Sequence, residues 1–374
     1  MKTLFKLFFA IASVLFMATA ISQAQPVAPV QVAEVIFIAG AAVGFVRFLF
    51  LIATPFARHN RATGLALAVT FEIWEDFIAS NLFKSYQWIL RAKDRTARVI
   101  NGSIVHIPQA GTVVSTRRNR SVYPVPLVKR SDNDITYTID EISSEATHIK
   151  NAETVELSYD KINDVLGDHV NQIGRDVARN AMFRWLASLN AANINRSTGA
   201  DTAVYISTQT GTRKKYMAAD LATGKTTMIN QTKRESGNRI AVMSEGAYNQ
   251  IKSDSIVTAK ETMDSVGAVW KDGVLVRLHG FDIIRTDVMP LFTNASPPVA
   301  KDPLDESVAT AVTDNDVIAL LDLSFVHCAK GDVKFFETLQ DALLQGDAYS
   351  ALVRCGFARE RNDQAGVVAV VQIA

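Results

Sequence analysis

The feature that most constrains the fold of this 374-residue chain is a long amphipathic stretch near its middle. Its apolar residues recur at helical spacing and form one stripe: Ile162, Val165, Leu166, Val170, Ile173, Val177, Met182, Phe183 and Leu186. A helix of about 30 residues is roughly 45 Å long, at ~1.5 Å per residue. We therefore expect one helix over residues 158–189 that spans a domain as a strut.

Two glycines lie inside this predicted helix. Gly167 and Gly174 each cost roughly 1 kcal/mol of helix propensity. They are seven residues apart, so they share one face of the helix. We expect this face to let another element pack closely.

The segment before the helix is polarised in charge, with basic residues followed by acidic ones: Arg117, Arg118, Arg120, Lys129 and Arg130, then Asp132, Asp134, Asp140, Glu141 and Glu145. Its strand-like pieces are residues 121–128 and 134–140. Pro124 and Pro126 cannot donate to a strand ladder, which places the first piece at a sheet edge or in a projecting arm. Two interpretations stay open: a solvated hairpin, or an arm that lies across a neighbouring subunit and pairs opposite charges there.

Helix and strand patterns are mixed through the rest of the body, which indicates an α+β fold. Helices are predicted at 65–93, as one or two amphipathic segments, and at 213–232. Strands are predicted at 95–111, at 314–339 and in the Val-rich C-terminal run. Residues 238–254 predict a strand, a turn and a helix, and residues 273–290 predict two strands about Gly280.

Composition and motifs give no positive reason to expect an enzyme. The formal net charge is +1, so nothing overall demands a nucleic acid partner. The two cysteines, Cys328 and Cys355, form no CxxC, and the six histidines form no metal-binding pair. Residues 222–227, ATGKTT, end like a phosphate-binding loop, but Ala219 stands where its first glycine belongs. We expect no catalytic residue, cofactor or metal.

The first 64 residues differ from the rest. Residues 1–25 have the pattern of a secretory signal peptide, with a candidate cleavage site at Ala24 and Gln25. Residues 35–56 form a second apolar run, long enough to cross a bilayer. Residues 1–64 hold five of the 39 basic and one of the 38 acidic residues, which leaves a slightly acidic body of 34 against 37. A start assigned too far upstream, a cleaved leader and a retained anchor all stay open.

Taken in order, the segments of the body resemble the major capsid protein of tailed bacteriophages, which has the Hong Kong 97 type of fold. The resemblance covers about residues 66–374 and depends on collinear order, not on one motif. The segments that carry it are EIWEDFIASNLFK (72–84), GSIVHIPQAG (102–111), the run 134–170, NRIAVMSEGAYNQI (238–251), LHGFDIIRTDVMP (278–290) and the run 346–372.

The resemblance implies a set of structural parts after the leader or extension 1–64. These are an N-terminal arm (65–100), an extended loop (101–148), a peripheral domain (149–202) with the spine helix 158–189, an axial domain (203–330) and a C-terminal return to the peripheral and axial sheets (331–374). The extended loop is then expected to contact the adjacent subunit through Arg117, Arg118, Arg120, Lys129, Arg130, Asp132 and Asp134.

The function implied by the resemblance is self-assembly, through pentamers and hexamers, into an icosahedral shell that encloses double-stranded phage DNA. An acidic body suits weak, non-specific DNA contact. Portal and scaffolding or protease proteins are the further partners implied, with assembly in the host cytoplasm and a final place in the virion. Membrane contact is expected only if residues 1–64 are retained. The alternatives are a nanocompartment shell of the same fold and an exported, membrane-anchored binding protein.

Overall fold

The computed structural model describes residues 75, 77–100, 103–110, 116–125, 127, 132–150, 161–259, 263–341 and 345–373. The chain divides into two compact units, Met1–Glu72 and Ile73–Ala374, and the described residues all belong to the second. The predicted leader, with its candidate cleavage site at Ala24 and Gln25, lies outside them. In this described part, no helix has both the length and the apolar character that a membrane span requires.

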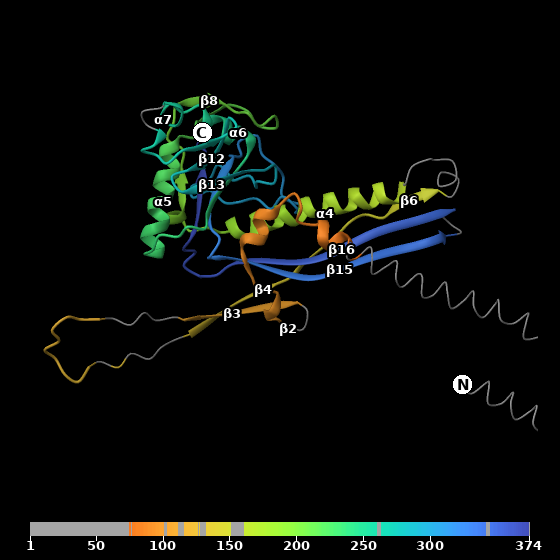
Figure 1. Cartoon of the computed structure of the whole chain (residues 1–374), viewed down its shortest axis with the longest axis horizontal. Helices are drawn as coiled ribbons and strands as arrows, with labels where there is room; N and C mark the ends of the chain where they lie inside the picture. Colours follow the sequence, from red (N-terminus) through yellow and green to blue (C-terminus); the bar gives the residue numbers. More distant parts are fainter. Residues whose placement is uncertain are drawn as a thin grey trace, which may run out of the picture. The chain divides into compact units, whose positions relative to one another are not determined.

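The predicted central helix is present as α4 (Lys161–Leu186), with 26 residues and a length of about 39 Å (Figure 1). It ends three residues before the predicted Leu189, because Ser188 adopts a left-handed backbone conformation with φ 50°. Val170, Ile173, Val177 and Met182 of the predicted stripe are buried, as expected. The predicted start at Ser158 lies outside the described residues.

The two glycines of α4 have different surroundings. A Cβ atom on Gly174 would lie 2.7 Å from the carbonyl oxygen of Leu82, whereas one on Gly167 would meet nothing within 4 Å. The prediction that another element packs closely on this face is therefore confirmed at Gly174 and wrong at Gly167. The close partner is the backbone of the segment that precedes the sheets.

Helix α4 packs on a sheet built around two long antiparallel strands, β15 (Val326–Asp341) and β16 (Gly346–Arg359) (Figure 1). Three short strands extend this sheet: β1 (Lys93–Asp94) beside β15, and β5 (Asp140–Ser143) and β6 (Thr147–Lys150) beside β16. Trp185 joins the two layers. Its ring lies edge-on to Trp88 and Phe357, and its indole N–H donates to the carbonyl of His327 at 3.2 Å.

The second sheet has seven strands and contains a large buried core. Its order is β11 (Val269–Lys271), β12 (Val274–Leu278), β13 (Phe281–Arg285), β10 (Arg239–Met243), β14 (Val317–Asp322), β17 (Val367–Val371) and β7 (Ile194–Arg196). Three helices accompany it: α5 (Ala218–Thr232), α6 (Glu245–Lys252) and α7 (Ser255–Thr258). The helix predicted at 213–232, the strand and helix at 238–254, the two strands about Gly280 and the buried C-terminal strand are all confirmed. A separate pair, β8 (Asp201–Ala203) and β9 (Thr212–Lys214), completes this part.

A three-stranded antiparallel sheet, which includes a hairpin, lies beside the long sheet (Figure 1). It consists of β2 (Val99–Ile100), β3 (Ile104–Ala110) and β4 (Asp132–Thr138), of which β3 and β4 form the hairpin. The strand predicted at 95–111 is confirmed from Val99 on, whereas Thr96–Arg98 form a 3-10 helix instead. The strand predicted at 134–140 is confirmed by β4. The strand predicted at 121–128 is wrong over its described residues, 121–125 and 127, which form no strand. Proline at 124 offers no N–H to a ladder, which favours the projecting arm over the sheet edge.

Over its described residues, the helix predicted at 65–93 is shorter than expected. Helix is present at residue 75 and over 77–81, followed by the 3-10 helix η1 (Gln87–Arg91). Two further 3-10 helices are η2 (Thr96–Arg98) and η3 (Ala191–Asn193). Helices and sheets are both prominent, so the α+β class is confirmed.

Candidate interaction surfaces

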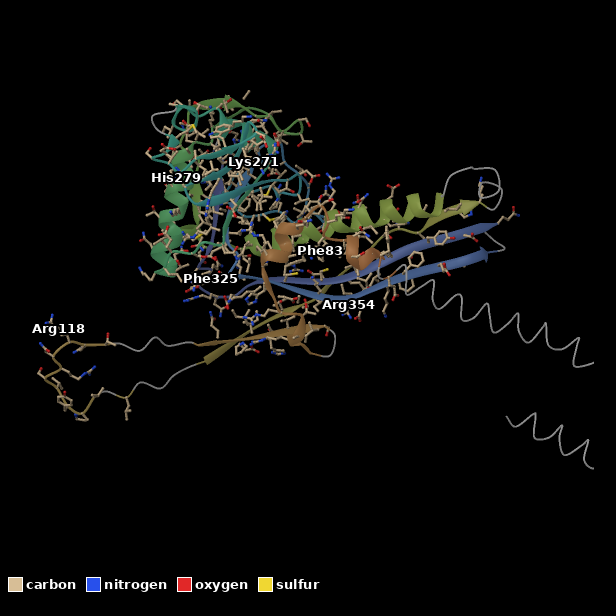
Figure 2. The ribbon with its side chains drawn as sticks, viewed as in Figure 1. Phe83, Arg118, Lys271, His279, Phe325 and Arg354 are labelled. Atoms are coloured by element: carbon tan, nitrogen blue, oxygen red, sulfur yellow. The ribbon has the colours of Figure 1, made fainter. Side chains whose placement is uncertain are left out.

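Residues 116–125 and 127, the described part of the connection between β3 and β4, lie beyond the hairpin and carry exposed apolar side chains. We call residues 111–131 the arm; residues 116–125 and 127 of it are described. Val122, Tyr123 and Leu127 are 70, 73 and 102% exposed. Arg117 and Arg118 are exposed beside them, and Figure 2 shows Arg118 far from the two sheets. Apolar side chains gathered on one exposed segment are typical of an interaction site.

The other predicted contact residues have varied positions. Arg120 is half-buried, and Lys129 and Arg130 lie outside the described residues. Asp132 begins β4, with its side chain outside the description. Asp134 lies on β4 and pairs with His106 of β3, with 2.6 Å between Oδ2 and Nδ1. The structure thus places the described arginines in the arm and Asp134 in the hairpin that supports it.

Asp140, which begins β5 two residues after the hairpin strand β4 ends, is hydrogen-bonded to side chains of α4. Arg184 donates two hydrogen bonds to this carboxylate, Nη2 to Oδ1 at 2.7 Å and Nε to Oδ2 at 3.0 Å, and Asn180 donates a third at 2.9 Å. Val105, Ile107, Ile139 and Ala329 form a small core directly beneath. Asp140 therefore has partners within its own chain, and the hairpin leaves the body in a defined direction.

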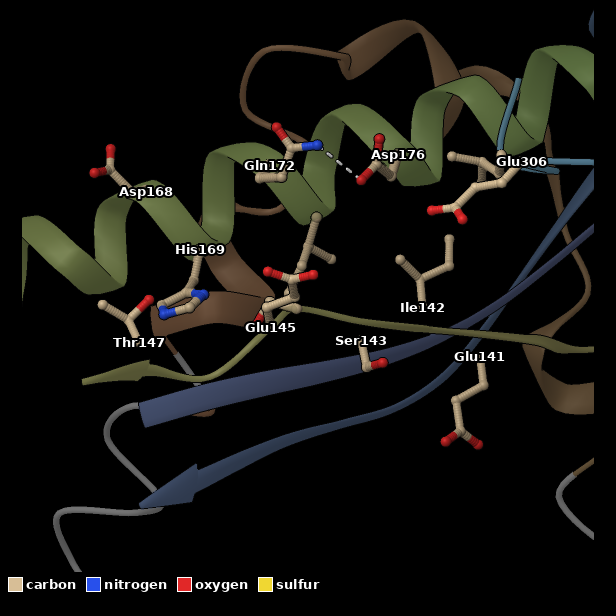
Figure 3. Close-up of a pocket in the computed structure, with 13 residues that line it drawn as sticks. Glu141, Ile142, Ser143, Glu145, Thr147, Asp168, His169, Gln172, Asp176 and Glu306 are labelled. Atoms are coloured by element: carbon tan, nitrogen blue, oxygen red, sulfur yellow. Dashed lines mark hydrogen bonds between the residues drawn. The ribbon is translucent and has the colours of Figure 1, made fainter. Parts of the chain in front are cut away.

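A groove of about 780 Å³ lies between α4, the β5–β6 segment and the loop after β13 (Figure 3). Five carboxylates line it: Glu141, Glu145, Asp168, Asp176 and Glu306. We call it the acidic groove. In Figure 3, Glu145 and Glu306 point into the space between α4 and β5, while Glu141 and Asp168 point away from it. A second hollow of about 430 Å³ shares some of these residues and adds Asp302 and Asp305.

The negative charge of the acidic groove is largely uncompensated. Asp176 pairs with Arg179 at 3.1 Å, but Glu141, Glu145, Asp168 and Glu306 form no ion pair with any described residue. His169, which is 8% exposed, lines the groove with its Nε2 unbonded. Burial lowers the pKa of His169, against the opposite effect of Asp168, so the ring is neutral at pH 7 and adds no positive charge.

One buried carboxyl group of the second sheet is held in an internal network. Asp316 accepts hydrogen bonds from Ser244 at 2.6 Å and from Tyr205, and burial raises the pKa of its carboxyl. No three His, Cys, Asp or Glu side chains in the described part are placed to bind a metal. The ATGKTT segment lies inside α5, where a Cβ on Gly224 would clash with the side chain of Leu320. It is a packing surface, not a phosphate-binding loop.

Sequence reasoning missed both the acidic groove and the apolar side of the arm. The groove residues are far apart in the chain, and no local pattern joins them. The sequence pattern predicts a strand for the apolar residues of the arm, although the prolines on either side of Val125 argue against a place inside a sheet.

No family model and no curated protein sequence matches this chain. Solved structures do match. The capsid structure of the cyanophage P-SCSP1u aligns with a TM-score of 0.51 and 18% identity, over 75% of this chain and 86% of that one. The head structure of the Helicobacter pylori bacteriophage KHP40 aligns with a TM-score of 0.51 and 12% identity, over 73% and 86%. The chain therefore has the α+β fold of bacteriophage capsid proteins, which confirms the resemblance noted from its sequence.

Proposed function

We propose that this chain is a major capsid protein, whose copies assemble into an icosahedral shell around double-stranded phage DNA. The observation that carries the proposal is the arm. A side chain such as Leu127, 102% exposed, forgoes roughly 1.5–3 kcal/mol of burial free energy in the isolated chain. Contact with a second copy recovers this free energy, and the capsid fold supplies the geometry for many such contacts.

The architecture suits a container wall. Stable contacts between proteins bury roughly 1,200–2,000 Å², and the long sheet, α4 and the arm offer extended surfaces for several of them. Head-to-tail contacts close into rings when the rotation permits, and we propose pentamers and hexamers of this kind. The slightly acidic body favours enclosing DNA without trapping it, because tight phosphate binding needs an excess of Lys and Arg.

The parts of the chain take roles in this proposal. Residues 65–100 are the N-terminal arm, and residues 101–148 are the extended loop, which contains the arm at 111–131. Residues 149–202 are the peripheral domain, 203–330 the axial domain and 331–374 the C-terminal return. The shell is part of the virion and assembles in the host cytoplasm. Portal and scaffolding or protease proteins are the proposed additional partners.

Negative-stain microscopy tests the proposal directly. The full chain and residues 65–374 are each expressed and purified, and we expect hollow particles of uniform diameter. The matched variant Val122→Ser, Tyr123→Ser, Leu127→Ser removes the exposed apolar residues of the arm. We expect it to fold with an unchanged melting temperature, because these side chains make little contact in the isolated chain, yet to lose the particles.

Two outcomes contradict parts of this proposal. A monodisperse monomer from both expressed forms at high concentration refutes the shell. Particles that contain a protein cargo and no nuclease-protected DNA refute the DNA-enclosing role and favour the nanocompartment instead.

A further inference from the structure

The acidic groove combines unpaired carboxylates with an apolar lining, and these two properties together suit an organic cation. We infer that the groove binds a linear aliphatic diamine or polyamine, with ammonium groups at Glu145 and Glu306 and a methylene chain between them. The inferred site lies within one copy of the chain. It is therefore independent of the proposed shell function and of any contact between copies.

The charge of the groove favours a cationic ligand. Glu145 and Glu306 point into it, and neither forms an ion pair with a described residue. The described residues that line the groove include no lysine and no arginine. An ammonium group has three donors and no acceptor, so it forms charge-assisted hydrogen bonds with carboxylates of this kind.

The carboxylates are too dispersed to bind a single metal ion. A calcium ion takes roughly six to eight oxygen ligands at about 2.3–2.6 Å. In the described part of the chain, no three His, Cys, Asp or Glu side chains are placed to share one metal ion. Glu145 lies between β5 and β6, whereas Glu306 lies in the loop after β13. A ligand that carries its positive charges on separate atoms reaches both carboxylates.

The apolar side chains of the groove favour an aliphatic ligand. Ile142, Ile173 and Leu304 line the same space as the carboxylates, and Leu304 is 38% exposed. A methylene chain between two ammonium groups gains free energy by covering these side chains, whereas a hydrated metal ion does not. The groove volume of about 780 Å³ is also within the range of roughly 300–1,000 Å³ that is typical of small-molecule sites.

A buried histidine is independent evidence that the groove receives a ligand. His169 is 8% exposed, lines the groove and has no hydrogen-bond partner for its Nε2. Figure 3 shows its ring on the side of α4 that faces the β5–β6 segment. Burial lowers the pKa of His169, and a neutral imidazole ring offers one of its nitrogens as an acceptor. An ammonium group held by Glu145 supplies the donor that Nε2 lacks.

Isothermal titration calorimetry of the full chain, below the concentration at which it assembles, tests the inference. The probes are spermidine, diaminobutane, diaminohexane and diaminooctane, with butylamine and Mg²⁺ as controls. We expect the best amine to bind with a dissociation constant on the order of 1 mM or below at low salt, and more weakly as NaCl is added. It should bind at least about tenfold more tightly than butylamine or Mg²⁺. Affinity should also pass through a maximum as the diamine lengthens, because the two carboxylates are held at a fixed separation.

Matched substitutions identify the residues of the site. Glu145→Gln with Glu306→Gln removes both charges at nearly constant shape and should weaken the best amine at least about tenfold. His169→Phe keeps a buried ring without an acceptor and should weaken it about three- to tenfold. The control Asp264→Asn with Asp272→Asn makes the same change in charge at exposed positions outside the groove, and we expect it to bind normally. Melting temperatures without ligand establish that each variant is folded, and the two single glutamine variants replace the double variant if it is not.

Several outcomes overturn the site. Unchanged binding by folded glutamine variants does so, and equal affinity for Mg²⁺ or butylamine shows only general charge attraction. Equal affinity for all three diamines excludes the two-point contact. A lysine-rich peptide that binds more tightly than every amine, and loses its binding in the same variants, identifies a protein partner instead. Amine binding by a chain that never forms particles contradicts the proposed function and leaves this inference standing.

Discussion

The paired substitutions Gly174→Ala and Gly167→Ala give the sharpest test of how α4 is packed. Both glycines lie in the interior of the same helix, so alanine gains about 1 kcal/mol of helix propensity at either position. Only at Gly174 does the added methyl group meet another element, because its Cβ would lie 2.7 Å from the carbonyl oxygen of Leu82. The two variants therefore share one favourable effect and differ in one unfavourable effect.

The size of the difference follows from overpacking. Forcing an extra methyl group against backbone in a packed interior costs typically about 1–3 kcal/mol. Gly174→Ala should therefore range from neutral to about 2 kcal/mol less stable than the parent protein, whereas Gly167→Ala should be about 1 kcal/mol more stable. The gap between the variants, about 1–3 kcal/mol, measures the close approach of Leu82 alone.

Urea unfolding of the unassembled chain, followed by circular dichroism at equal protein concentration, measures this gap. Midpoints are compared only if the denaturant slopes agree, because a change in slope signals a change in the unfolded state. Equal midpoints, or a higher midpoint for Gly174→Ala than for Gly167→Ala, refute the packing of residue 82 against this face of the helix.

Three further results are expected. Burial raises the pKa of Glu360, but the Lys93 ammonium group, which donates to both carboxylate oxygens at 2.6 and 2.7 Å, outweighs burial and lowers the pKa to about 2. His327 lies 3.9 Å from this carboxylate, too far for a hydrogen bond. Because the pKa of Glu360 in the folded protein is below the ordinary value of 4.5, this stabilisation is complete above about pH 4.5 and is lost as the pH falls toward 2. After allowance for solvent screening, Glu360→Gln should remove about 1–2 kcal/mol at pH 7 and almost nothing at pH 2, read from melting temperatures. Trp185→Ala should cost about 3–5 kcal/mol, since its fully buried ring joins α4 to the long sheet, and a loss below about 1 kcal/mol in urea unfolding would contradict that role. Cys328 should resist a thiol reagent at pH 8 in the folded chain and react at once in denaturant, and rapid labelling of the folded chain would show that its burial is wrong.

Local pattern was enough to predict much of this fold. The apolar stripe predicted α4, and the Val-rich C-terminal run predicted the buried strand β17. Both signals are periodic patterns of apolar residues within one segment. Such a pattern can be read from the sequence without knowledge of the tertiary structure. The same reasoning failed for residues 121–125, because exposed apolar residues and core-facing ones look alike when the partner surface is unknown.

Tertiary structure alone decided the features on which the proposed contacts depend. Gly167 and Gly174 are equivalent in the sequence of the helix, and only the path of residue 82 distinguishes them. Glu145, Asp168 and Glu306 come from three separate segments and form one groove only because α4, the β5–β6 segment and the loop after β13 converge. The periodicity of a helix or strand follows from short-range backbone geometry, whereas the approach of distant segments depends on how the whole chain packs, and a single sequence does not display that.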